Sequence, residues 1–172
     1  MVSRAFLSLG SNLGDRAGYL VLAIRAMLNG DLPVNRLSNI YETAPVDITE
    51  QPDFLNMVVE LKGGIPGPAD LLAQLLIIET QLGRTREVAR GPRTIDIDLL
   101  IWDALTIATG ELTLPHPRMH MRRFVLVPLA ELAPDLIIPG QIDPIAKLRD
   151  NCEDLADVRI WIPNIDTIHP TT

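Results

Sequence analysis

Short apolar runs and helix-spaced apolar positions define the first two-thirds of this chain. Runs rich in leucine, valine and isoleucine predict four β-strands at about 5–9, 34–41, 54–61 and 95–101. Apolar residues at helical spacing predict one helix that stops at Asn29-Gly30, and a second over about 69–82 that stops at Gly83. The order β-α-β-β-α-β is the ferredoxin-like arrangement of the α+β class. We therefore expect an antiparallel sheet with both helices on one face and the other face available.

The remaining third predicts C-terminal additions to this core. The apolar segment 125–132 is expected to dock into the core, and residues 142–148 predict a short helix. From about Glu153 onward the sequence carries no clear pattern. With 172 residues and no linker-like stretch, the chain is expected to form a single domain, 1–172.

The strand at 95–101 carries two acidic side chains on one face. Because successive side chains of a strand point to opposite faces, Thr94, Asp96 and Asp98 share one face. The other face is apolar and consists of Ile95, Ile97, Leu99 and Ile101. Two such carboxylates, about 6.5–7 Å apart at Cα, suit a pair of divalent cations, and oxygen ligands favour Mg²⁺ or Mn²⁺. A solvated strand face is the simpler interpretation of the D-x-D pattern alone.

The segment just before that strand is rich in arginine. Residues 83–93 hold four arginines and one acid, in a chain whose formal net charge is −7. Flanking glycines and Pro92 indicate a loop. Guanidinium groups match phosphate oxygens in geometry and charge. The segment therefore favours a polyphosphate held between cations and arginines over a loop that serves only solubility.

The strand at 54–61 contributes a different kind of polar face. Its apolar face consists of Leu55, Met57, Val59 and Leu61. Phe54 and Asn56 lie opposite that face, just as Asp96 and Asp98 do on their strand. An aromatic ring beside an amide suits a flat heterocycle, although an ordinary core edge is an equal alternative. If both strands share one sheet, all four residues point into one open site.

Composition narrows the class of protein. The 47% hydrophobic and 22% charged content is that of a globular protein. A single cysteine, Cys152, fits a reducing cytosol, and no apolar run reaches membrane-spanning length, so a cytoplasmic protein without a membrane partner is expected. The acidic balance argues against a nucleic-acid partner. His116 and His120, in a second basic stretch at 115–124, lack the spacing of a zinc site.

Several motifs together resemble one family, the 6-hydroxymethyl-7,8-dihydropterin pyrophosphokinases of folate biosynthesis. The resemblance covers about residues 5–139 and is most specific at 91–98, with the sequence GPRTIDID. It also includes LGSNLG at 9–14, YETAP at 41–45, QPDFLN at 51–56, LPHPRM at 114–119 and RRFVL at 122–126. Such an enzyme transfers pyrophosphate from ATP to the pterin hydroxymethyl group and releases AMP, with two Mg²⁺ ions.

The resemblance implies a role for each matching residue. Asp96 and Asp98 would be the metal ligands, and Arg84 and Arg93 would neutralise the phosphates during in-line attack. Phe54 and Phe124 would sandwich the pterin ring, whose edge would be read by Asn56, Thr43 and the backbone at Val46. The remaining ATP-site residues would be Glu79, Arg86, Leu99, Thr113, His116 and Arg122. The expected partners are ATP and the pterin alone, bound by a monomer.

Two rival interpretations come from other classes of protein. A catalytically silent protein on the same fold would bind Mg²⁺-ATP without forming AMP, but the intact D-x-D pair and Arg84 and Arg93 argue against it. A D-x-D glycosyltransferase would use a sugar nucleotide, but the chain is short and shows no acceptor domain.

Overall fold

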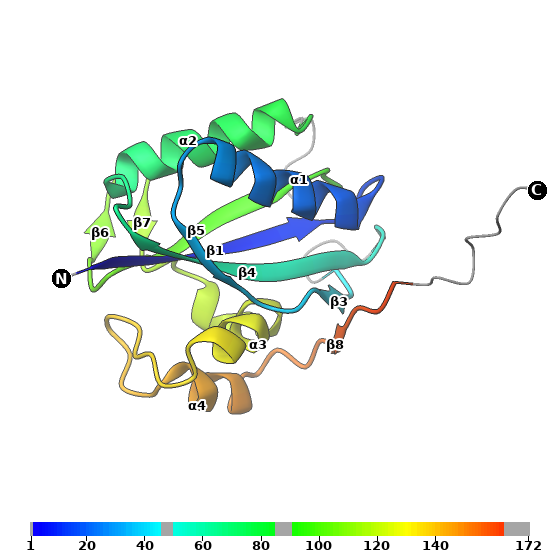
Figure 1. The fold of residues 1–172 in the computed structure, drawn as a ribbon. Helices are drawn as coiled ribbons and strands as arrows, with labels where there is room; N and C mark the ends of the chain where they lie inside the picture. Colours follow the sequence, from blue (N-terminus) through cyan, green and yellow to red (C-terminus); the bar gives the residue numbers. More distant parts are fainter. Residues whose placement is uncertain (1, 46–49, 85–90, 164–172) are drawn as a thin grey trace, which may run out of the picture.

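The computed structural model, which describes residues 2–45, 50–84 and 91–163, is built on one antiparallel sheet. Its strands follow the order β5-β1-β4-β3-β8, and β2 also pairs with β4 (Figure 1). These strands are β1 (Ser3–Ser11), β2 (Val34–Leu37), β3 (Tyr41–Thr43), β4 (Phe54–Gly63), β5 (Asp96–Trp102) and β8 (Val158–Ile160). The α+β fold predicted from the sequence is confirmed.

Two helices, α1 (Arg16–Asn29) and α2 (Pro68–Gln81), cover one face of the sheet (Figure 1). Helix α1 is capped by Asp15, whose Oδ1 accepts a hydrogen bond from the Gly18 N–H at 3.0 Å. Helix α2 begins with a proline, and the chain leaves it through Gly83, which has a φ of +78°. A left-handed residue there favours glycine, as the predicted stop requires.

The core between helices and sheet contains the apolar face predicted for β4. Leu55, Met57, Val59 and Leu61 are all buried in it. Ile95, just before β5, and Ile97 and Leu99 on β5 also lie in this core, but Ile101 does not, contrary to the prediction. The reason is a register shift: Leu7 of β1 pairs with Leu99, whereas the preceding Phe6 pairs with Ile101. The irregularity turns Ile101 to the opposite face.

The predicted strand at 34–41 is divided into β2 and β3. Between them, the Val58 N–H of β4 donates a hydrogen bond to Ser38 Oγ at 2.9 Å. This side chain takes the place of the Ser38 carbonyl as acceptor, whereas the Ser38 N–H still donates to the Val58 carbonyl at 2.9 Å, so only half of the backbone pair is kept there.

The C-terminal third is divided between the two faces of the sheet: segment 119–148 covers part of the opposite face, whereas Ile107 and Leu114 pack on the helix side. It contains a small sheet of β6 (Ile107–Ala108) and β7 (Thr113–Leu114), a 3₁₀ turn (Met119–Met121), and the helices α3 (Arg123–Leu132) and α4 (Ile145–Asp150). Helix α3 packs its apolar side chains on Phe6 and Val58, which confirms the predicted docking (Figure 1). None of the described helices has both the length and the apolar character needed to cross a membrane.

Candidate functional site

Strand β1 lies between β4 and β5 and brings the two predicted polar faces together. Gly10 is paired with Asn56 on one side and with Asp96 on the other. Two residues earlier on β1, Ser8 is paired with Val58 of β4 and Asp98 of β5. Because paired residues point to the same face, the acids of β5 and the amide of β4 face one space.

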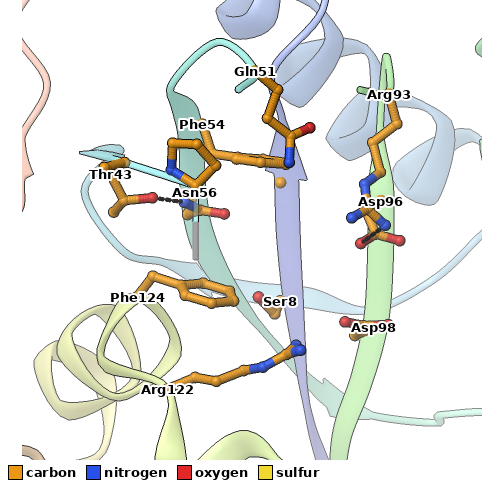
Figure 2. Close-up of a pocket in the computed structure, with 13 residues that line it drawn as sticks. Ser8, Thr43, Gln51, Phe54, Asn56, Arg93, Asp96, Asp98, Arg122 and Phe124 are labelled. Atoms are coloured by element: carbon orange, nitrogen blue, oxygen red, sulfur yellow. Dashed lines mark hydrogen bonds and ion pairs between the residues drawn. The ribbon is translucent and has the colours of Figure 1, made fainter. Parts of the chain in front are cut away.

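A pocket opens over this part of the sheet, beside the N-terminus of α3 (Figure 2). Eight of the residues predicted to form the site line it: Thr43, Phe54, Asn56, Arg93, Asp96, Asp98, Arg122 and Phe124. The structure therefore places both predicted groups, the carboxylates and the aromatic–amide pair, in a single cavity.

One half of the pocket is aromatic and neutral. Figure 2 shows Phe54, from β4, and Phe124, from α3, on opposite sides of the space, with Asn56 between them. The Asn56 Nδ2 donates a hydrogen bond to Thr43 Oγ1 at 2.7 Å, which fixes the amide. Asn56 and Thr43 are both buried. This half can stack a flat ring and present a fixed amide to its edge.

The other half of the pocket is charged. Asp96 accepts from two arginines: its Oδ1 lies 2.6 Å from an Arg84 nitrogen and its Oδ2 lies 2.8 Å from an Arg93 nitrogen. The Nε of Arg93 is buried and has no hydrogen-bond partner in the described part of the chain. Such a buried donor suits an anionic oxygen from a ligand.

Asp98 lies in an environment that is unfavourable to its charge. Burial, and next the nearby charge of Asp96, together raise the pKa of Asp98 to about 6. The positive charges of Arg122, Arg84 and Arg93 act in the opposite direction but do not offset this. A buried pair of like charges is stabilised by a cation.

The donor set fits Mg²⁺ bound together with a polyphosphate. Among residues 2–45, 50–84 and 91–163, no cluster of three or more His, Cys, Asp or Glu side chains forms a complete metal cage. Mg²⁺ usually takes one or two carboxylates and completes its shell with water and substrate phosphates. Asp96 and Asp98, which line the pocket together, would supply those two carboxylates.

Glu79 lies behind the charged half of the pocket and supports it. It is almost completely buried on α2, is paired with Arg84, and accepts a 2.6 Å hydrogen bond from the Ile97 N–H of β5. Burial raises the pKa of Glu79, while the hydrogen bond from Ile97 and the charge of Arg84 oppose that shift. Glu79 thus holds Arg84 in position toward Asp96.

Comparison with known proteins identifies the family. The family model for 7,8-dihydro-6-hydroxymethylpterin-pyrophosphokinase (HPPK) matches residues 6–134. A Bacillus subtilis protein named 2-amino-4-hydroxy-6-hydroxymethyldihydropteridine pyrophosphokinase is 43% identical over 91% of this chain and 89% of its own length. This chain belongs to the HPPK family. A Methylorubrum extorquens HPPK of the same name is 44% identical over 86% of this chain and 94% of its own.

Solved HPPK structures share the fold at low sequence identity. A chain described as HPPK-DHPS in complex with substrates superposes with a TM-score of 0.71 at 15% identity, covering 86% of this chain. The wild-type Plasmodium falciparum HPPK-DHPS with pteroate gives a TM-score of 0.67 at 16% identity, covering 87% of this chain. This chain spans only 43% and 42% of those longer chains.

Some residues that the HPPK resemblance assigned to ATP lie outside the pocket. Leu99 points into the core on the helix side of the sheet, and Thr113 is exposed on β7. The backbone N–H of His116 donates a hydrogen bond to the Leu100 carbonyl at 2.8 Å. Burial lowers the pKa of the His116 imidazole to about 4. Val46 and Arg86 lie outside the described residues.

The pocket also contains five residues that the sequence prediction did not assign to the HPPK site: Ser8, Gly10, Ala44, Pro45 and Gln51. A signal for two of them was present, because Ser8 and Gly10 alternate with Leu7 and Leu9. A Cβ at Gly10 would lie only 2.8 Å from Asn56 Oδ1. Glycine at this position therefore leaves room for the amide.

Proposed function

We propose that this chain transfers the pyrophosphoryl group of ATP to the hydroxymethyl group of 6-hydroxymethyl-7,8-dihydropterin in folate biosynthesis. The observation that carries this proposal is that a carboxylate–arginine cluster and an aromatic–amide pair open into one pocket. Pyrophosphokinase is also the activity that the names of its full-length relatives state.

The neutral half of the pocket suits the pterin. The ring would stack between Phe54 and Phe124, and Asn56 would hydrogen-bond its polar edge. The hydrogen bond to Thr43 engages one of the two Nδ2 hydrogens of Asn56 and so fixes the orientation in which the amide meets the ring. The hydroxymethyl group would then point along the sheet toward β5.

The charged half suits the triphosphate. Arg84 and Arg93 would exchange Asp96 for phosphate oxygens, while Asp96 and Asp98 would hold two Mg²⁺ ions. When bound, these ions neutralise phosphate charge and align the reacting groups. The remaining ATP contacts assigned by family resemblance stay predictions, as do the monomeric state and the cytoplasmic location.

The reaction needs positioning more than proton transfer. The pterin hydroxyl oxygen forms a bond to the β-phosphorus of ATP while the bond from that phosphorus to the α-phosphate oxygen breaks. AMP leaves, and the hydroxyl proton passes to solvent. A loose phosphoryl-transfer transition state asks little of a general base, so fixed charges and alignment account for most of the acceleration.

Product analysis tests this function directly. Incubation with ATP, Mg²⁺ and the pterin should give AMP and the pterin diphosphate in equal amounts. Asp96→Ala should abolish both products, whereas Asp135→Ala, which removes an exposed acid distant in sequence, should not. Formation of ADP would contradict pyrophosphoryl transfer, and ATP binding without turnover would favour a silent binding protein.

A further inference from the structure

A C-terminal segment, residues 153–163, supports the aromatic half of the pocket from outside the family match. The HPPK family model ends at residue 134, whereas this segment passes α3 and adds β8 to the sheet edge (Figure 1). Val158 of β8 is paired with Thr43 of β3, the residue that fixes Asn56. The segment therefore contacts the structure behind the pocket at more than one point.

Asp154 makes the contact nearest to the pocket. Its Oδ2 accepts a 2.9 Å hydrogen bond from the Arg123 N–H, the first residue of α3. Its Oδ1 accepts a 3.0 Å hydrogen bond from the Ala156 N–H within the segment. One partly buried carboxylate thus ties the start of α3 to the chain that leads into β8.

Helix α3 lacks an N-terminal cap of its own. Arg122, at the N-cap position, makes no side-chain capping bond, and the first turn contains no acid. The N-terminal end of a helix is electropositive, so Arg122 and Arg123 there are unfavourable to it. Asp154 supplies the missing anionic acceptor from 31 residues away in the sequence.

The turn that Asp154 caps is the turn that enters the pocket. Arg122 and Phe124 both line the cavity and flank Arg123, and the Arg122 guanidinium lies 5.4 Å from the centre of the Phe124 ring. We infer that Asp154 is a positioning residue for pterin recognition, which acts by holding the Phe124 ring at the distance from Phe54 that a stacked heterocycle requires. This inference rests on the proposed pterin site.

Steady-state kinetics with each substrate varied separately test the inference. Asp154→Ala should raise the KM for the pterin about 5-fold, the scale of losing one helix cap, while the KM for ATP changes less than about 2-fold. Asp154→Asn, which keeps an acceptor oxygen but loses the charge, should give a smaller rise. Glu153→Ala removes the neighbouring exposed acid and should leave both KM values unchanged.

A double-mutant cycle shows whether Asp154 acts through Phe124. In a Phe124→Leu background, Asp154→Ala should alter the KM for the pterin by less than about 2-fold, since the positioned ring is absent. An equal rise in both backgrounds would overturn the inference, as would a lower Tm with unchanged KM values. If Asp154→Ala does not fold, the same criteria apply to Asp154→Asn.

Direct binding separates this inference from the proposed function. Calorimetric titration of wild type with the pterin, in the presence of Mg²⁺ and a non-hydrolysable ATP analogue, needs no turnover. Weaker pterin binding by Asp154→Ala would support positioning even if AMP were never formed. If Phe124→Leu leaves pterin affinity unchanged, the assigned pterin site is wrong and the inference fails with it.

Discussion

Two arginine–carboxylate clusters lie at opposite ends of the same sheet face, and they differ in how completely their charges are matched. At one end, Glu60 of β4 is buried and bound by Arg4, by Arg36 at 2.5 Å and by Asn35 at 2.8 Å. At the other end, Asp96 and Asp98 line an open pocket. Between the two, Phe6 and Val58 are covered by α3.

The pKa values express this difference. Burial alone would raise the pKa of Glu60, but hydrogen bonds from Arg36, Arg4 and Asn35 outweigh it and lower the pKa to about 2. Burial and Asp96 instead raise the pKa of Asp98 to about 6. One carboxylate is satisfied within the fold, whereas the other lacks sufficient positive charge. The first stabilises the protein, and the second is suited to bind a cation.

The largest expected difference between the two ends is in catalysis. Asp98→Asn should lower kcat about 1,000-fold, because it removes a ligand for the ions that neutralise the phosphates. Glu60→Gln should leave kcat within about 2-fold. Quantifying AMP by chromatography measures both values. A loss of less than about 10-fold for Asp98→Asn would remove Asp98 from the metal site.

For stability we expect the reverse: the substitution at Glu60, and not the one at Asp98, should destabilise the fold. Glu60→Gln removes the charge that binds two arginines, so we expect the free energy of unfolding to fall by about 2–3 kcal/mol. Urea denaturation followed by circular dichroism measures this, with the exposed Glu153→Gln as the matched control. If Glu60→Gln and Glu153→Gln unfold at the same urea concentration, the Glu60 cluster does not stabilise the fold.

Acid should remove the Glu60 contribution selectively. Since the folded pKa of Glu60 lies near 2 and its ordinary value is 4.5, the stabilisation is complete above about pH 4.5 and is lost as the pH falls toward 2. The wild type should therefore lose its advantage of about 2–3 kcal/mol over Glu60→Gln across that interval. Urea titrations at intervals from pH 7 to pH 2.5 follow it, and a constant difference would be inconsistent with the Glu60 ion pairs.

The pocket beside Asp96 also depends on the room that Gly10 leaves for the Asn56 amide. Gly10→Ala should raise the KM for the pterin about 10-fold, because the new methyl group would contact Asn56 Oδ1 at 2.8 Å and displace the amide. Gly64→Ala is the matched control, since a Cβ there meets nothing within 4 Å. Equal kinetics for the two variants would show that the Asn56 position does not determine pterin affinity.

The smallest effect concerns the metal-free protein. Because the pKa of Asp98 is raised in the folded state, its charge opposes folding at neutral pH, and protonation below about pH 6 relieves this. Asp98→Asn should therefore stabilise the EDTA-treated protein at pH 7.5 by about 1 kcal/mol, the opposite sign to Glu60→Gln. Thermal unfolding measures the sign. A lower Tm for Asp98→Asn would contradict the claim that the Asp98 charge destabilises the metal-free protein.

The fold and most of the pocket residues could be predicted from the sequence, because both depend on local patterns. Strand alternation placed Asp96, Asp98, Phe54 and Asn56 on one face, and the structure brings them into one pocket. The side-chain orientation of Ile101 was not predictable, since it depends on the register between β1 and β5. Periodicity within one strand does not specify that pairing.

Long-range contacts account for most of what was missed. Nothing near Glu60 in the sequence indicates that Arg4 and Arg36 converge on it, because β1 and β2 bring them there. The segment after about residue 153 has no periodic pattern, yet it forms β8 and caps α3 through Asp154. Strand pairing and tertiary hydrogen bonds of this kind are set by the folded arrangement.

The central claim is that the Asp96–Asp98 end of the sheet face binds cations and that the Glu60 end does not. Counting bound ions tests this claim. Mn²⁺ titration followed by electron paramagnetic resonance, with a non-hydrolysable ATP analogue present, gives ions bound per chain. Wild type and Glu60→Gln should each bind two ions, whereas Asp98→Asn should lose at least one or bind it far more weakly. Two ions bound by Asp98→Asn with wild-type affinity would contradict the account.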